Sequence, residues 1–371
     1  DMTTSMFGAI VGDIAGSKYE HHNCKSYRDI EIFKAGSHVT DDTILTLATA
    51  DYYILNHNGI STTFQDVYRD WANRYPQVGY GRAFRSWFSS DDKNPPPYNS
   101  WGNGAAMRVS PIAWMAHKDL TWVLEQAKLC ADVTHNHPEG VKGAEATAAA
   151  IFLARTGHDK EEIRSYLTQK FDGYDLTRTV AQIRPTYSFS TAAAETVPEA
   201  IIAFLDSKDF LDAIRLAISL GGDSDTIAAI AGSIAQAYYA TEIPDWMAQY
   251  CRTLLRHDQI QVLDAFWAQC AVKRAKWYYW LDAAVGRNAR GWHPFDPQAG
   301  AKLESLIQKD KTKQQVQWKL KSGSIWYYID VSTMTQRNAT TGRVRPIRRF
   351  LEGEYFHPHE PPIYDPPPFD L

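Results

Sequence analysis

The spacing of apolar residues over the first 268 positions most constrains the fold. Apolar residues recur there at i, i+3 and i+4, the spacing of a helix that buries one face. No convincing run of alternating apolar and polar residues indicates strands in this part. We therefore predict an all-α bundle whose central helices are the ones rich in alanine and glycine. The predicted helices lie within 7–16, 64–75, 121–135, 141–157, 161–171, 197–207, 210–222, 225–240 and 245–269.

Beyond residue 275 the sequence changes in texture. Short aromatic and β-branched runs follow one another, separated by Gly, Asn and Asp, which is typical of a small sheet. One helical segment, 297–310, interrupts them, and the last residues are proline-rich and predicted to be extended or disordered. We therefore expect a helical domain over 5–268, a small α+β domain over 274–352 and a Pro-rich tail over 353–371.

Charge is divided unevenly between these parts. The 371 residues carry a formal net charge of −4, with 39 Lys and Arg against 43 Asp and Glu. Residues 271–371 hold 16 of the basic residues but only 10 of the acidic ones, so the preceding part is acidic. An acidic body suits bound cations, and a basic C-terminal part suits an anion such as a phosphate.

The cysteines and the apolar runs bear on where the protein works. Cys24, Cys130, Cys251 and Cys270 are scattered without a CxxC pair, which argues against a disulfide framework and a thiolate zinc site. No apolar run reaches the ~18 residues of a membrane-spanning helix, and no signal peptide is evident. We expect an intracellular protein, of the cytoplasm or nucleus, with no membrane partner.

Two segments far apart in the sequence share one pattern, in which two aspartates and a threonine precede an apolar helix. A single aspartate there is a common helix cap, and that alternative accounts for either segment alone. A cap needs only one side-chain oxygen, however, and a buried carboxylate is costly unless it is paired or binds a metal. The repetition favours an oxygen-only site for Mg²⁺, Mn²⁺ or Ca²⁺. The candidate ligands are Thr40, Asp41, Asp42, Asp223, Asp225 and Thr226.

The segment 7–20 contributes a helix with unusual residues. Gly8, Gly12 and Gly16 are four residues apart, so on a helix they form one smooth face for close packing. Asp13 lies in the same apolar helix and must be hydrogen-bonded there. Glu20 follows just after the helix, on a stretch that looks exposed.

Two further motifs suggest ligand binding. Residues 100–104 form a Gly-rich loop ahead of a helix, whose backbone N–H groups suit a phosphate, although an ordinary turn is the simpler alternative. His135 and His137 form an HxH pair, but no third ligand for zinc is evident.

Six motifs occur in order along residues 5–268: "GDIAGSKYE", "VTDDT", "SWGNGAAMR", "THNHPEG", "ETVPEAIIAFLDS" and "LGGDSDTIAAIAGSIA". In this order and spacing they resemble the ADP-ribosylglycohydrolase family, which includes the ADP-ribosyl-acceptor hydrolases. The resemblance implies a compact all-α orthogonal bundle with a binuclear Mg²⁺ centre, or Mn²⁺ in its place. The metal ligands that it implies are the six residues of the aspartate motifs.

The same resemblance assigns roles to other residues. The family's mobile acidic residue corresponds to Glu20. The implied ADP-ribose site consists of Ser100, Trp101, Gly102, Asn103 and Gly104 for the diphosphate and ribose, with His135 at the ribose. A water would attack as the bond at C1″ breaks in an oxocarbenium-like step. Glu20, Asp41 and Asp225 all stay open as its proton acceptor.

The C-terminal part carries a second set of motifs: "WYYW", "GWHPFD", "LESLI" and "YYIDVSTMTQRNATTGRVRPIRR". Over 274–352 these resemble a WWE domain, a module that binds the iso-ADP-ribose unit of poly(ADP-ribose). The implied pocket is formed by Tyr278, Trp292, Tyr327, Gln336 and Arg345. Aromatic rings would sandwich the adenine, and an arginine would meet a phosphate. A small aromatic β-domain for protein contacts is the alternative.

Together the two resemblances imply a Mg²⁺-dependent hydrolase that removes ADP-ribose from its acceptors and is held on them by the WWE module. Its partners would be ADP-ribosylated proteins or poly(ADP-ribose), and direct nucleic-acid binding is not expected. One alternative is a catalytically inactive reader of ADP-ribose, and another is a general Mg²⁺-dependent phosphohydrolase. The acceptor linkage stays open between arginine, serine, a nucleic-acid base and the polymer itself.

Overall fold

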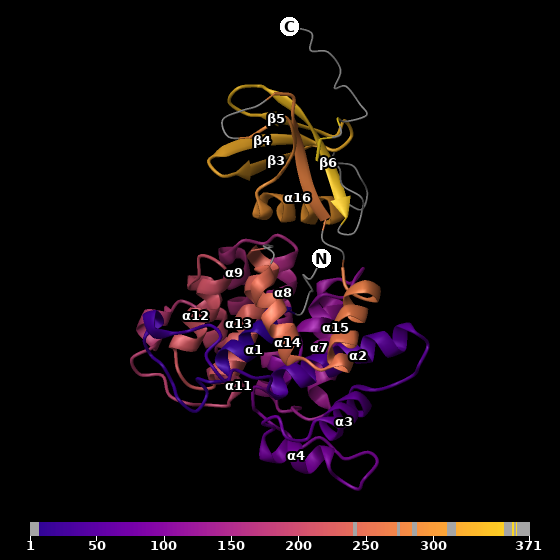
Figure 1. The fold of residues 1–371 in the computed structure, drawn as a ribbon, viewed down its shortest axis with the longest axis vertical. Coiled ribbons are helices and arrows are strands. Elements are labelled where there is room, and N and C mark those ends of the chain that lie inside the picture. Colours follow the sequence, from indigo (N-terminus) through magenta and orange to yellow (C-terminus); the bar gives the residue numbers. More distant parts are fainter. Residues whose placement is uncertain are drawn as a thin grey trace. The chain divides into compact units, whose positions relative to one another are not determined.

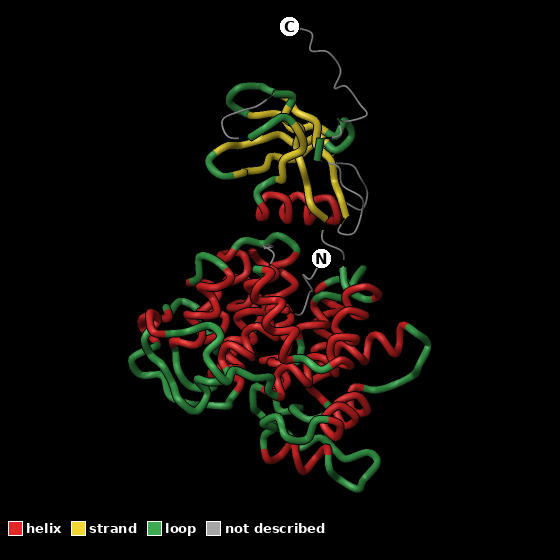
Figure 2. Tube along the Cα trace, viewed as in Figure 1, coloured by secondary structure: helices red, strands yellow, loops and turns green. Residues whose placement is uncertain are grey.

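The computed structural model describes residues 7–239, 243–272, 275–283, 288–309, 317–351, 358–359 and 361. Contacts within the chain define two compact units, which are described separately here. One consists of Asp1–Ala154 and Asp159–Val272, and the other of Arg155–His158 and Lys273–Leu371. The first is built from helices and the second from strands with one helix (Figures 1 and 2).

The prediction of an all-α fold for the first unit is confirmed. None of the described helices combines the length and the apolar character that a membrane crossing requires. The helices are α1 (Phe7–Gly16), α2 (Asp41–His57), α3 (Phe64–Arg74), α4 (Arg82–Phe88), α5 (Gly104–Met107), α6 (Ser110–Ala113), α7 (Leu120–Asp132), α8 (Pro138–Arg155), α9 (Lys160–Lys170), α10 (Val180–Ile183), α11 (Ala193–Asp206), α12 (Phe210–Ser219), α13 (Ser224–Tyr239), α14 (Asp245–Leu254) and α15 (His257–Gln269).

The glycine face of α1 packs directly on α13. A Cβ atom added at Gly12 would overlap the carbonyl oxygen of Ala228, and one added at Gly16 would lie 2.5 Å from the Cα of Asp225. Since such distances leave no room for a side chain, the predicted smooth face is confirmed. The contact fixes the end of α1 against the beginning of α13, where Asp225 lies.

The turn before α13 also depends on glycine. Gly221 and Gly222 have φ angles of +78° and +80°, a left-handed conformation that glycine adopts without steric cost. These two residues form the turn after α12, and Asp223 follows them directly, next to the start of α13.

The prediction of one continuous helical segment over 245–269 is wrong. The helical pattern over 245–269 is divided into α14 and α15, because Leu255 and Arg256 are extended, with ψ angles of 145° and 163°. The side chain of Gln259 accepts a hydrogen bond of 2.9 Å from the backbone N–H of Arg256 and so caps the new helix. A capping residue can end an otherwise continuous apolar period.

The second unit is a six-stranded antiparallel sheet in the order β2-β1-β6-β5-β4-β3, with α16 (Pro297–Lys309) packed on it. Its core includes Trp277, Leu303 and Ile329. The predicted sheet with one helix is therefore confirmed, while most of the predicted tail over 353–371 lies outside the described residues. The strands are β1 (Ala275–Leu281), β2 (Gly291–Pro294), β3 (Gln317–Ser322), β4 (Ile325–Asp330), β5 (Thr335–Asn338) and β6 (Val344–Leu351).

Candidate metal centre and ligand cavity

Asp13 is the polar centre around which the site is built. Its carboxylate is fully buried and accepts hydrogen bonds from the Thr40 N–H (3.0 Å) and the Thr40 hydroxyl (2.6 Å). It also accepts from the N–H (3.2 Å) and hydroxyl (2.5 Å) of Thr43. Burial raises the pKa of Asp13, and these bonds oppose the rise. The prediction that this aspartate must be hydrogen-bonded is confirmed.

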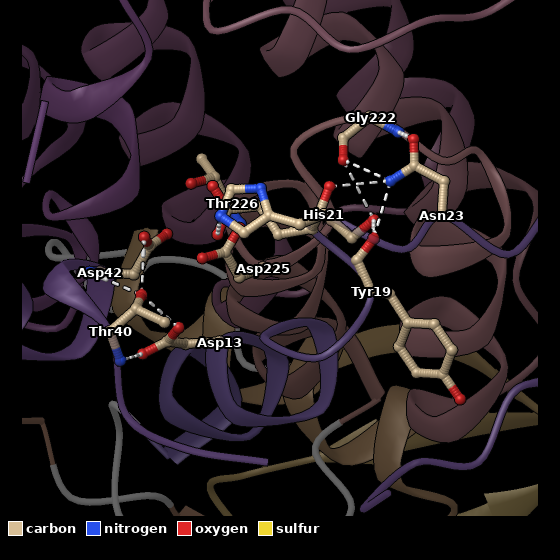
Figure 3. Close-up of polar contacts among 11 residues, drawn as sticks. Asp13, Tyr19, His21, Asn23, Thr40, Asp42, Gly222, Asp225 and Thr226 are labelled. Atoms are coloured by element: carbon tan, nitrogen blue, oxygen red, sulfur yellow. Dashed lines mark hydrogen bonds and ion pairs between the residues drawn. The ribbon is translucent and has the colours of Figure 1, made fainter. Parts of the chain in front are cut away.

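Thr40 has two roles at the start of α2. It is the N-cap, since its hydroxyl oxygen accepts a hydrogen bond from the Asp42 N–H at 3.3 Å. The same oxygen lies 3.2 Å from a carboxylate oxygen of Asp42 (Figure 3). The cap and the candidate site therefore coincide, and Asp13 holds the cap in place.

Carboxylates from three elements converge here in two groups. Asp13, Asp42 and Asp225 place one oxygen each within 4.8 Å of one another, and Glu20, Asp223 and Asp225 do the same. Asp225 belongs to both groups. Acidic residues so arranged could hold metal ions.

The state of these carboxylates fits a cation. One oxygen of Asp42, Oδ1, is buried and has no hydrogen-bond partner among the described residues. Burial, followed by the charges of neighbouring carboxylates, raises the pKa values of Asp42 and Asp225 well above the ordinary value. A bound cation would remove both the repulsion and the unpaired oxygen.

Asp223 is held by the Gly-rich loop. The amide of Asn103 donates to its carboxylate at 2.7 Å and to the hydroxyl of Thr196 at 3.1 Å. The structure thus links Asn103, which the resemblance placed in the ADP-ribose loop, to the acidic site. Thr226 is buried beside Asp225, whose carboxylate accepts its N–H at 3.0 Å.

Asp41 lies outside both groups. It faces the cavity near Gly79, where an added Cβ would be 3.2 Å from its Oδ1. Burial, followed by the charges of Asp13 and Asp223, raises its pKa well above the ordinary value. The structure therefore places Asp41 on the wall, beside the acidic groups.

Glu20 lies at the cavity, partly buried, on the segment that follows α1. His21 pairs with it at 3.5 Å, and burial, followed by the charge of Asp223, raises its pKa. Asn23 ties this segment down, because its amide donates to the Tyr19 and Gly222 carbonyls at 2.7 and 3.0 Å (Figure 3). The Gly222 N–H returns a bond of 2.9 Å to Asn23 Oδ1. Sequence reasoning missed Asn23.

A cavity of about 370 Å³ opens beside the acidic groups. Trp101, by contrast, is 56% exposed and does not line it. Sequence reasoning missed several of its lining residues, including Tyr98 and Arg108. An arginine inside an apolar helical stretch was the available signal for Arg108. The predicted residues that line the cavity are Glu20, Asp41, Asp42, Ser100, Gly102, Asn103, Gly104, His135, Asp223, Asp225 and Thr226.

The two histidines of the HxH pair lie in different environments. His135 is buried at the cavity, and Nδ1 of its ring lies 2.7 Å from the Thr134 hydroxyl. Nδ1 of His137 instead accepts the Glu139 N–H at 3.1 Å, at the start of α8. Neither belongs to the groups of potential metal-binding side chains found among the described residues.

The second unit has a cavity of about 440 Å³. Tyr327, Gln336 and Arg345, all expected in the iso-ADP-ribose pocket, line it. Tyr278 and Trp292 do not, and the ring of Trp292 instead packs on Trp280 with centroids 5.4 Å apart. The neighbouring Tyr279 does not line the cavity either, but its ring centroid lies 5.6 Å from the guanidinium of Arg345, which does. The remaining lining residues are Asn338, Thr341 and Arg343.

Comparison with known proteins gives the family of the chain. The profile of the ADP-ribosylglycohydrolase family matches residues 2–309, and that of the WWE domain matches residues 275–349. The chain belongs to the ADP-ribosylglycohydrolase family. The WWE match lies at the C-terminal end of the ADP-ribosylglycohydrolase match, and the two matched ranges overlap over 275–309.

Several curated relatives are named as hydrolases of ADP-ribosylated substrates. The chain is 27% identical over 227 residues to the ADP-ribosylarginine hydrolase Tri1 of Pseudomonas putida (strain GB-1), covering 56% of this chain and 61% of that one. It is 26% identical over 319 residues to the ADP-ribosylhydrolase ARH3 of Gallus gallus, covering 66% and 87%. A solved ADP-ribosylglycohydrolase-related protein complex shares the fold, with a TM-score of 0.54 and 25% identity over 72% of this chain and 96% of that one.

Proposed function

We propose that this family member is a Mg²⁺-dependent hydrolase that releases ADP-ribose from ADP-ribosylated protein side chains or from poly(ADP-ribose). The observation that carries the proposal is the pair of acidic groups, joined by Asp225, on the wall of a cavity of ligand size. Such a site suits two hard cations, with Mn²⁺ as the alternative to Mg²⁺.

The chain's own residues supply the ligands for two ions. Asp42 and Asp225, with the hydroxyls of Thr40 and Thr226, would hold one. Asp223 and Asp225 would hold the other, and Asp41 stands on the wall beside them. When bound, the ions hold the hydroxyl groups of the ribose and stabilise negative charge near the scissile bond. Asp13 keeps Thr40 in place through two hydrogen bonds, and two more to Thr43 hold the first turn of α2.

Glu20 is the residue best placed to move a proton. It borders the cavity, it is only partly buried, and burial raises its pKa above that of an ordinary glutamate, in the direction that favours proton transfer. Asp225 lies in both acidic groups and is better suited to ligation. Glu20→Gln should therefore abolish release while the variant still binds ADP-ribose.

The WWE domain would hold the enzyme on its target. Oε1 of Gln336 and Nε of Arg345 are buried at its cavity and have no hydrogen-bond partner among the described residues. We propose that iso-ADP-ribose supplies those partners, with Tyr327 and Tyr279 as the aromatic walls. Tethering would raise the local concentration of the catalytic unit at the polymer.

A release assay with matched acceptors tests the proposal. The full chain is incubated with arginine-linked, serine-linked, base-linked and polymeric ADP-ribose, with Mg²⁺ or EDTA, and free ADP-ribose is quantified. Mg²⁺-dependent release from at least one acceptor is the expected result. Absence of release from all four, combined with calorimetric binding of ADP-ribose, would establish a reader instead.

A further inference from the structure

A buried arginine forms part of the cavity wall. Arg108 is 0% exposed, and its guanidinium carbon lies 4.0 Å from the ring centroid of Tyr68. Its Nη2 donates to the Cys130 carbonyl at 2.6 Å and to the Thr134 hydroxyl at 2.8 Å. Nε and Nη1 have no hydrogen-bond partner among the described residues. A permanent positive charge thus lies within the wall of the cavity.

The bond to Thr134 continues to His135. A guanidinium can only donate, so the hydroxyl oxygen of Thr134 accepts from Arg108. The hydroxyl then has its own hydrogen to give, and Nδ1 of His135 is 2.7 Å away. Tyr98 also forms a side-chain hydrogen bond with Thr134, so its oxygen competes with Nδ1 for this hydrogen, and the charge of Arg108 decides between them.

The charge of Arg108 favours the same arrangement. Burial, followed by this charge, lowers the pKa of His135 well below its ordinary value, so the ring is neutral and carries one proton. Nδ1 is on the side of the ring that faces the guanidinium. An unprotonated Nδ1, with its lone pair toward the positive charge, is electrostatically favoured there over an Nδ1–H group. The pKa of Tyr98, the other titratable group beside the ring, is raised to about 12 by burial, so it brings no negative charge.

The other ring nitrogen faces the Gly-rich loop. A Cβ atom added at Gly104 would lie 2.8 Å from Nε2 of His135, and one added at Gly102 would lie 3.8 Å away. The absence of side chains at these two positions lets the ring edge reach the cavity.

We propose that Arg108 and Thr134 are positioning residues that hold His135 as a fixed Nε2–H donor to a ribose or diphosphate oxygen of the ligand. This inference rests on the proposed function for its ligand, but the tautomer itself does not. It also assigns His135 to binding alone, because a donor fixed in this way does not accept the proton that a general base must take.

The ring protonation can be read directly. Nitrogen NMR of the full chain, labelled with ¹⁵N-histidine and compared with a His135→Gln variant for assignment, reports the state of each ring nitrogen. We expect Nδ1 of His135 to be unprotonated and Nε2 protonated at neutral pH. The reverse tautomer, or a doubly protonated ring, would overturn the proposal. No ligand or turnover is needed, so failure here is distinct from failure of the proposed function.

Two substitutions at Thr134 then test whether the hydrogen bonds from Arg108 through Thr134 to His135 fix the ring. Thr134→Val keeps the shape but removes the hydroxyl, so the tautomer should become mixed and ADP-ribose should bind about tenfold more weakly. Thr134→Ser keeps the hydroxyl and should match the wild type in both measurements. Equal spectra and affinities for the valine and serine variants would refute this role of Thr134. If the valine variant does not fold, the wild-type spectrum still decides the tautomer.

Discussion

At the scale of the residue, Asp225 connects the site to the stability of the fold. Its pKa is raised well above the ordinary value by burial and then by the charges of Asp42 and Asp223. Above the ordinary carboxyl pKa of about 4, the folded chain therefore binds more protons than the unfolded chain. The free energy of unfolding falls as the pH rises from there through the raised value.

This dependence of stability on pH predicts how Mg²⁺ affects thermal unfolding. In EDTA the melting temperature should be lower at pH 8 than at pH 5, and Mg²⁺ should raise it more at pH 8, because protons no longer compete for the carboxylates. Thermal unfolding in the four conditions is the measurement. An equal Mg²⁺ effect at both pH values would contradict the proposed ligands.

Asp225→Asn separates the stability of the site from its activity. Removing one charge relieves repulsion, so in EDTA at pH 8 the variant should unfold at a higher temperature than the wild type, by roughly 1–3 kcal/mol of unfolding free energy. It should lose both the Mg²⁺ response and the release of ADP-ribose. Asp172→Asn, at an exposed aspartate of the same unit, serves as the control and should change neither.

At the scale of the element, the contact between α1 and α13 keeps the acidic groups together. Gly12→Ala places a Cβ on the Ala228 carbonyl, so the helices must separate. We expect a loss of about 1–3 kcal/mol or more in unfolding free energy and a fall in turnover. Gly300→Ala is the control, because the nearest atom to its added Cβ is Phe295 Cβ at 3.9 Å. Denaturant unfolding and release assays on both variants give the comparison.

Sequence reasoning succeeded where a pattern was long or repeated. Apolar periodicity predicted the long helices, and the four-residue glycine spacing predicted the close face of α1. The helices α4, α5, α6 and α10 span four to seven residues, which is too short for a helical period to show. The break at Leu255 depends on a cap rather than on apolar spacing.

The sequence predicted less well which face of a strand or helix each side chain occupies. Successive residues of a strand face opposite sides, so the motif alone does not decide which of Tyr278 and Tyr279 faces Arg345, and the structure places Tyr279 there. Asp41 and Asp42 are adjacent in sequence, yet only Asp42 joins an acidic group, because helix geometry turns neighbours apart. The bonds of Asn103 to Asp223 and of Asn23 to Gly222 span long sequence separations, so the motifs did not predict these contacts.

At the scale of the whole molecule, the two units should be separable in function. Arg345→Ala should weaken binding to poly(ADP-ribose) about tenfold or more, since a charge-assisted contact is lost. Release from a small mono-ADP-ribosylated substrate should be unchanged. Arg337→Ala is the matched control, because this exposed arginine of the same strand pair lies over Tyr328, 4.9 Å from its ring, and does not line the cavity. Polymer binding by anisotropy and parallel turnover assays distinguish the variants.

The amide of Asn23 has a consequence for how Glu20 is held at the cavity. Its bonds to Tyr19 and Gly222 engage both the donor and the acceptor end of one side chain. Moving the Glu20 segment away from Gly222 must break the two bonds between Asn23 and Gly222 together, so one side chain couples the position of Glu20 to the turn that precedes α13.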